Sequence, residues 1–224
     1  MIHVRTRIQR PEPALVTGLA QYSSATIHEA QGRRGALDSA LKPIDRSMSF
    51  CGPAVTVVCA PRDNLMLQVA IHYAEPGDVL VVSAGEFSEA GTFGDVLGTA
   101  MHSKGLAALV TDSGVRDTAD LIELGLPVFS RSVCIKGTVK ETLGPINHPI
   151  VFGGEVVEPG DIVKGDADGV VQVKAADAQW VIDACAEREA SEAELRELYR
   201  AGGTTIELCN LVEKLAAKGL LVEE

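Results

Sequence analysis

The residue types that could do chemistry gather in residues 90–120, AGTFGDVLGTAMHSKGLAALVTDSGVRDTAD. One glycine-rich turn carries Asp95, and a second turn, beyond twenty intervening residues, carries Arg116 and Asp117. That spacing accommodates a helix followed by a strand, so both turns can return to the same edge of a sheet. Ligands of open α/β sheets bind beyond the carboxyl ends of the strands. We therefore predict that this edge holds a divalent metal ion and a small oxoacid.

The first turn, GTFGDVLG, offers backbone groups to an anion. Glycines such as Gly94 let the chain turn sharply and approach a ligand. The unpaired N–H groups of Val96 and Leu97, at the predicted start of a helix, favour negative charge. A substrate carboxylate would fit there. Glycine turns before helices are common, however, and the alternative is a plain strand-to-helix turn in which Asp95 is an N-terminal charge.

The second turn places Arg116 beside Asp117, and the side chains of neighbours in a turn can diverge. An arginine fork can hold the keto oxygen and the carboxylate of a 2-oxoacid. Asp117 can bind a hard divalent ion, because Mg²⁺ typically takes one or two protein carboxylates and keeps several waters. Asp95 would then orient a metal-bound water. The alternative is an ordinary Arg–Asp ion pair at the start of a helix.

The elements that must position these turns follow a regular order. Strands and helices alternate from about residue 54 to residue 133, which predicts a mostly parallel sheet with covering helices. Residues 156–173 favour two strands in a hairpin-like meander. Residues 177–200 predict a long helix with an apolar stripe that reaches Leu198, and residues 204–219 predict a final helix.

Composition and charge exclude several classes of protein. The chain has 224 residues, enough for one large domain or two small ones, and its formal net charge is −11. A chain that acidic repels phosphate backbones, which argues against nucleic acid as a direct ligand. The five cysteines show no CxxC spacing, which predicts reduced thiols in a cytoplasmic protein without zinc or disulfides. No signal peptide and no membrane span are predicted, because no long apolar run occurs.

Other candidate groups are weaker. The signatures GxSxG, HExxH, GxxxxGK[ST] and GxGxxG are absent from the sequence. A Schiff-base lysine remains an alternative to the metal, with Lys104 and Lys136 flanking the central region. His28 is either a helix residue at the edge of the core or a site residue. The run of aspartates at 161, 166 and 168 fits turns better than a calcium loop.

The D-x20-R-D pattern of Asp95, Arg116 and Asp117 resembles the signature of the 4-hydroxy-4-methyl-2-oxoglutarate and 4-carboxy-4-hydroxy-2-oxoadipate aldolases and the related RraA-like proteins. The resemblance covers about residues 14–220, through TIHEAQGRRG, PGDVLVV, GDVLG, GLPVFSR and VEPGDIVKGDADGVV. It implies a single compact α/β domain, residues 1–224, of the swivelling β/β/α kind. A central β layer flanked by helices would form the core, about residues 14–180, and C-terminal helices, 177–224, would contribute to an oligomer.

The resemblance also implies an activity: a divalent-metal-dependent class II pyruvate aldolase that also decarboxylates oxaloacetate. Gly94 to Leu97 would hold the substrate carboxylate through backbone amides, and Arg116 would hold the substrate oxygen and stabilise the enolate. Asp117 would bind Mg²⁺ or Mn²⁺, and Asp95 would act through a metal-bound water. Glu192, or alternatively Glu189, would come from a neighbouring subunit of a homotrimer or homohexamer.

Two other functions remain open. The RraA proteins of the same fold regulate an RNA-degrading enzyme by binding it, which would make this chain an interaction protein. A dedicated oxaloacetate decarboxylase is the other possibility. The segment TTIELCNLVEKLAAKGL resembles the extra tail of the aldolase branch, and the presence of Asp95, Arg116 and Asp117 together also favours catalysis.

Overall fold

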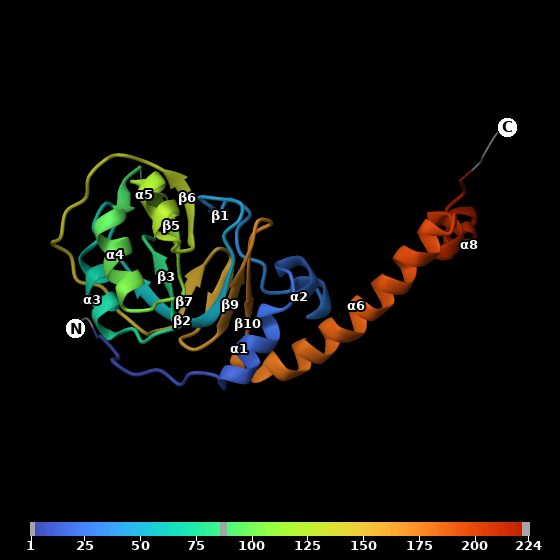
Figure 1. Ribbon diagram of the computed structural model, residues 1–224, viewed down its shortest axis with the longest axis horizontal. Coiled ribbons are helices and arrows are strands. Elements are labelled where there is room, and N and C mark those ends of the chain that lie inside the picture. Colours follow the sequence, from blue (N-terminus) through green and yellow to red (C-terminus); the bar gives the residue numbers. More distant parts are fainter. Residues whose placement is uncertain (1–2, 86–88, 221–224) are drawn as a thin grey trace.

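The computed structural model describes residues 3–85 and 89–220 (Figure 1). Within these ranges one sheet has eight strands, in the order β1-β6-β5-β3-β2-β9-β10 with β4 paired beside β5, and β7 and β8 form a second sheet. In chain order the elements are α1 (Pro13–Ala20), α2 (Ser24–Ala30), β1 (Lys42–Pro43), β2 (Phe50–Val58), α3 (Leu65–Tyr73), β3 (Val79–Ser83), β4 (Gly91–Phe93), α4 (Asp95–Ser103), β5 (Ala108–Val115), α5 (Thr118–Leu124), β6 (Val128–Val133), β7 (Ile150–Phe152), β8 (Glu155–Val157), β9 (Ile162–Gly165), β10 (Val170–Val173), η1 (Ala175–Asp177), α6 (Ala178–Arg200), α7 (Thr205–Leu208) and α8 (Leu211–Ala217).

The predicted parallel layer is confirmed. The neighbours β2 and β3, β3 and β5, and β5 and β6 all pair in parallel. Every residue of β3 is buried, as expected for a continuous apolar strand with both faces covered. The helices α3, α4 and α5 connect these strands, so the predicted α/β fold is confirmed as well.

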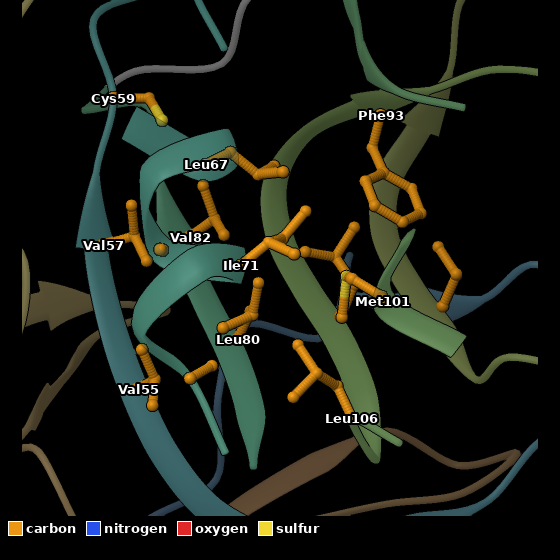
Figure 2. Close-up of a cluster of buried hydrophobic side chains, with 14 of the residues drawn as sticks. Val55, Val57, Cys59, Leu67, Ile71, Leu80, Val82, Phe93, Met101 and Leu106 are labelled. Carbon is orange, nitrogen blue, oxygen red and sulfur yellow. The ribbon is translucent and has the colours of Figure 1, made fainter. Parts of the chain in front are cut away.

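Side chains of this layer fill a separate core on each face of the sheet. Because strand residues alternate between faces, Leu80 and Val82 point to one side, and Val79 and Val81 point to the other. Figure 2 shows the first core, in which Leu67 and Ile71 of α3 and Met101 of α4 meet the strands. The second core lies against β7 and β9, and its Phe50 and Phe129 rings meet edge to face at 4.9 Å.

The segment after the parallel layer is partly as predicted. The strands β9 and β10 form an antiparallel hairpin around the turn at residues 166–169. Its aspartates bind protein donors: Asp161 accepts from Lys174 Nζ at 3.0 Å, and Asp166 accepts from the N–H and hydroxyl of Ser24. The prediction of one meander is wrong for β8, which pairs with β7 and not with β9.

The C-terminal helices depart from the body of the molecule. The predicted long helix is confirmed as α6, and its first half packs on α1 and α2 with Val181 and Cys185 fully buried. Its second half projects away from the sheet (Figure 1), and Leu198, the last residue of the predicted apolar stripe, is half exposed. The single final helix is wrong: it is split into α7 and α8 at Asn210, which adopts a left-handed backbone with φ 51° that asparagine tolerates.

None of the described helices combines the length and apolar character that crossing a bilayer requires.

Candidate active site

Three helices begin at the carboxyl edge of the parallel strands. The helix α3 follows β2, α4 follows β4, and α5 follows β5. Because parallel strands present their carboxyl ends at one edge, the first turns of these helices meet there. The two predicted turns therefore lie side by side, and the backbone N–H of Arg116 donates to the carbonyl of Phe93 at 2.8 Å.

The first turn is built as predicted, except that the short strand β4 precedes it. Gly94 is the residue before α4, and the N–H of Gly98 closes the first helical bond on the Gly94 carbonyl at 2.9 Å. The N–H groups of Asp95, Val96 and Leu97 thus have no partner within the helix, and that of Asp95 donates to Asp117 Oδ2 at 3.4 Å. A larger residue at position 94 would displace the carboxylate of Asp117, because an added Cβ would lie 2.2 Å from Asp117 Oδ2.

The second turn adopts an unusual backbone. Asp117, which precedes α5, has φ 54° and ψ 41°, a left-handed conformation in which aspartate is one of the tolerated residues. Its neighbour Arg116 does not diverge from it: Arg116 Nε lies 3.3 Å from Asp117 Oδ2. The ion pair weighed as the simpler alternative is therefore present. Arg116 remains exposed on its outer side and lines the cavity described next.

A cavity of about 220 Å³ opens between the two turns. It is lined by Gly94, Asp95, Val96, Leu97 and Arg116, so the structure brings together the residues predicted to bind substrate. The volume suits a small oxoacid. Asp117 stands behind Gly94 and does not line the cavity wall, although the N–H of Asp95 points at its carboxylate at 3.4 Å.

Sequence reasoning missed three polar residues of the cavity: Asn64, Gln68 and Lys140. Asn64 is buried, its amide donates to the carbonyl of Thr92 at 2.9 Å, and it accepts from Gln68 at 3.1 Å. Asn64 and Gln68 could have been found, because they begin the helix after β2 and the same edge rule applies to them. Lys140 comes from an irregular loop, and no local pattern marks it.

A buried aspartate joins two of these residues. Asp63 is 1% exposed and accepts the backbone N–H groups of Leu65, Glu141 and Thr142 at 2.7–2.9 Å. Burial alone would raise the pKa of Asp63, but these hydrogen bonds favour the ionised form and hold the pKa below its ordinary value. The carboxylate thus fixes the Lys140 loop against the start of α3.

The charges at the cavity suit an anion. Arg116 and Lys140 contribute two cations, and Asp95 contributes one carboxylate. The lysines considered for Schiff-base chemistry lie elsewhere. Lys104 ends α4 and donates to the carbonyl of Ile71 at 2.7 Å, and Lys136 forms an ion pair with Glu89.

The donor set of the turn is compatible with a hard cation. In the described chain no three His, Cys, Asp or Glu side chains cluster as a metal site, but Mg²⁺ needs only one or two protein carboxylates. Asp117 is one-third exposed, and both contacts recorded for its carboxylate fall on Oδ2. The space that glycine leaves at position 94 admits this carboxylate. Asp117 therefore fits the predicted role of a single direct ligand.

The remaining predicted residues lie outside the cavity. Glu192 sits on the projecting half of α6, 2.7 Å from Arg188 and 3.3 Å from Arg196, and Glu189 is exposed on the same helix. Figure 1 shows this half of α6 leading away from α4 and α5, so neither glutamate reaches the cavity of its own chain. His28 lies on α2, with Nδ1 3.0 Å from the Arg34 carbonyl, and is not part of the cavity.

Comparison with known proteins gives consistent matches. A family model described as RraA-like, Aldolase/RraA, matches residues 24–172. A protein of Halalkalibacterium halodurans, provisionally named a 4-hydroxy-4-methyl-2-oxoglutarate aldolase, is 34% identical over 85% of this chain and 90% of its own length. A protein of Burkholderia multivorans with the same provisional name is 30% identical over 63% of this chain and 86% of its own.

Solved structures agree with these matches. Streptomyces coelicolor RraAS2, described as an unusual member of the RNase ES inhibitor RraA protein family, has a TM-score of 0.75 and 32% identity, covering 85% of this chain and 99% of its own. The RNA-processing inhibitor RraA from Thermus thermophilis has a TM-score of 0.61 and 25% identity, covering 68% and 92%.

Proposed function

Since this chain belongs to the Aldolase/RraA family, we propose that it is a divalent-metal-dependent pyruvate aldolase. Its substrates would be 4-hydroxy-4-methyl-2-oxoglutarate or 4-carboxy-4-hydroxy-2-oxoadipate, cleaved to pyruvate and a second oxoacid. The observation that carries the proposal is the cavity in which the free amides of α4 and the guanidinium of Arg116 face the same small volume.

Different residues of the cavity would bind different groups of the substrate. The amides of Val96 and Leu97 bind the carboxylate of the oxoacid, and Arg116 binds its keto oxygen. When the C3–C4 bond breaks, its electron pair moves into the pyruvate enolate, and Arg116 stabilises the negative charge that develops on oxygen. The 4-hydroxyl proton leaves as that carbon becomes a carbonyl, and Asp95 at the cavity wall accepts it through a water molecule. A proton then returns from Asp95 through water to C3 of the enolate, which gives pyruvate.

A divalent ion would add to this stabilisation of the enolate. Asp117 would hold Mg²⁺ or Mn²⁺, and the ion would supply a Lewis acid for the charge on the enolate oxygen. Decarboxylation of oxaloacetate leaves the same enolate, so the same residues serve that reaction. Glu192 of a second copy would approach the cavity in a homotrimer or homohexamer, because its own helix leads away from it.

The test is a coupled assay of pyruvate release against a panel of 4-hydroxy-2-oxoacids and oxaloacetate, with Mg²⁺ and with EDTA. We expect turnover with Mg²⁺, its loss in EDTA and its return when Mg²⁺ is restored. Full turnover in chelator would reject the metal role and favour a lysine mechanism, for which Lys140 is the lysine nearest the substrate.

A regulatory function is the second candidate, because RraAS2, described as a member of an RNase ES inhibitor family, matches nearly its whole length to this chain. Binding to an RNase in a preparation that releases no pyruvate from any substrate of the panel would select it.

A further inference from the structure

A second carboxylate, Asp112, lies on β5 shortly before the catalytic turn and outside the cavity. One of its oxygens accepts the backbone N–H of Ala84 at 2.6 Å, and the other accepts the hydroxyl of Ser83 at 2.9 Å. The Ser83 hydroxyl in turn accepts the N–H of Gly85 at 3.2 Å. The side chain of Asp112 on β5 therefore fixes the exit of β3, which is the end of that strand and the residues that directly follow it.

Residues of β5 and the turn after it also bond to β4 and to Ala90 before it, which lead into the first turn of the site. Ser113 Oγ donates to the carbonyl of Ala90 at 3.4 Å, and Thr92 Oγ1 donates to the carbonyl of Gly114 at 3.2 Å. The N–H of Arg116 donates to the carbonyl of Phe93. The register of β5 against β6 shifts between Thr111 and Gly114, so this stretch departs from a regular ladder.

The charge on Asp112 has a cost. Its carboxylate is largely withdrawn from water, and this burial raises the pKa of Asp112 even though Ala84 and Ser83 donate to it and Arg131 of β6 lies nearby. A raised folded-state pKa means that the ionised form lowers stability: the stability contribution falls as pH rises from the ordinary aspartate pKa through the raised one. Arg131 is itself 3.2 Å from Asp38, and the buried Cys59 thiol is also close to Asp112.

We propose that Asp112 is a positioning residue of the candidate site, which holds the β3 exit in register with β5 so that the α4 amides and Arg116 face one cavity. The proposal rests on the proposed function for its kinetic consequences.

The experiment compares Asp112→Asn with Asp166→Asn. Asp166 is a comparable control, because its carboxylate also accepts a backbone N–H and a serine hydroxyl, both from Ser24, together with the N–H of Asp168, and it does not line the cavity. Burial alone would raise the pKa of Asp166, but the Ser24 hydrogen bonds outweigh it and lower the pKa, so its charge stabilises the fold. We expect Asp112→Asn to lose kcat/KM by roughly 10- to 100-fold, as for a small misplacement of reacting groups, a loss larger than any change in Tm explains. Asp166→Asn should lose Tm and keep kcat/KM.

Amide hydrogen exchange separates this proposal from the proposed function. Exchange of residues 89–97 should become faster in Asp112→Asn and stay as in the wild type in Asp166→Asn. If the wild type shows no lyase activity, the proposed function fails and the exchange result still decides the role of Asp112. Wild-type exchange at 89–97, or activity lost only in proportion to Tm, overturns the proposal. Should Asp112→Asn not fold, Ser83→Ala removes one of the two bonds and must give the same changes to a smaller extent.

Discussion

At the scale of single residues, the site depends on the placement of Arg116, whose backbone N–H donates to the carbonyl of Phe93. Truncation in Arg116→Ala removes the donor that would stabilise the enolate. We expect kcat to fall by roughly 10²- to 10³-fold, the loss seen when one oxyanion donor is removed, with little change in Tm because the side chain is exposed. Arg33→Ala, which removes an exposed guanidinium paired with Glu29, should leave kcat unchanged. Near-wild-type turnover of Arg116→Ala would eliminate the assigned role.

Gly94 provides a second residue-scale prediction. A methyl group at this position would lie 2.2 Å from Asp117 Oδ2, so Gly94→Ala must displace the carboxylate that is proposed to hold the ion. We expect a higher Mg²⁺ concentration for half-maximal activity and a lower kcat. Gly137→Ala is the control, because nothing lies within 4 Å of its added Cβ. Identical Mg²⁺ titrations of the two variants would show that Asp117 does not bind the ion.

The residues that sequence alone predicted share one property: their types and spacing report chemistry directly. Asp95, Arg116 and Asp117 are polar residues that follow buried strands, and topology brings them together. The close pairing of Arg116 with Asp117 was predicted only as an alternative, because the sequence does not show the left-handed backbone that Asp117 adopts. Lys140 was not predicted as a residue of the cavity, because its position depends on a distant buried carboxylate, Asp63, and not on local sequence.

At the scale of elements, Asp63 joins the start of α3 to the Lys140 loop, and its lowered pKa gives a pH prediction. A lowered folded-state pKa contributes stability that is present above the ordinary value of 3.8 and is lost as pH falls through the lowered one. We expect Asp63→Asn to lose about 1.5–3 kcal/mol of unfolding free energy at neutral pH, typical of a hydrogen-bonded charge, and to show a weaker acid dependence.

The measurement for Asp63 is denaturant unfolding between about pH 3 and pH 7. Asp45→Asn is the control: hydrogen bonds from Ser47 also lower the pKa of Asp45, but that carboxylate is exposed. Its loss should change stability little. Equal effects of the two substitutions would mean that the buried clamp adds nothing to the fold.

Helices and strands were predictable where the sequence has a clear hydrophobic period or a continuous apolar run. The buried run of β3 and the long α6 are examples, whereas the pairing of β8 with β7 was not predictable, because short strands of similar composition can pair with several neighbours. The break between α7 and α8 was not predicted either, since asparagine is compatible with both a helix interior and the left-handed turn that Asn210 forms.

At the scale of the whole molecule, the projecting half of α6 is the feature that a single chain leaves unexplained. Glu192 pairs only with arginines of the same helix among the printed contacts of the described chain, and Leu198, Ile206 and Val212 on α6–α8 are half exposed. A helix with exposed apolar side chains that leaves its own domain is suited to contact a second copy. The cavity, by contrast, faces outward with two cations, Arg116 and Lys140.

Subunit mixing tests whether Glu192 acts across copies of the chain. In Glu192→Gln and in Arg116→Ala each homo-oligomer should be nearly inactive, because every site lacks one group. If Glu192 serves a neighbour's site, mixed oligomers contain some sites that combine an intact Arg116 with an intact Glu192, and pyruvate release should return in part.

Glu194→Gln, an exposed change on the same helix, should retain activity. Mixing must be done under conditions in which labelled subunits demonstrably exchange. Failure of the mixture to recover activity after exchange would show that Glu192 does not act in the site of a neighbouring subunit.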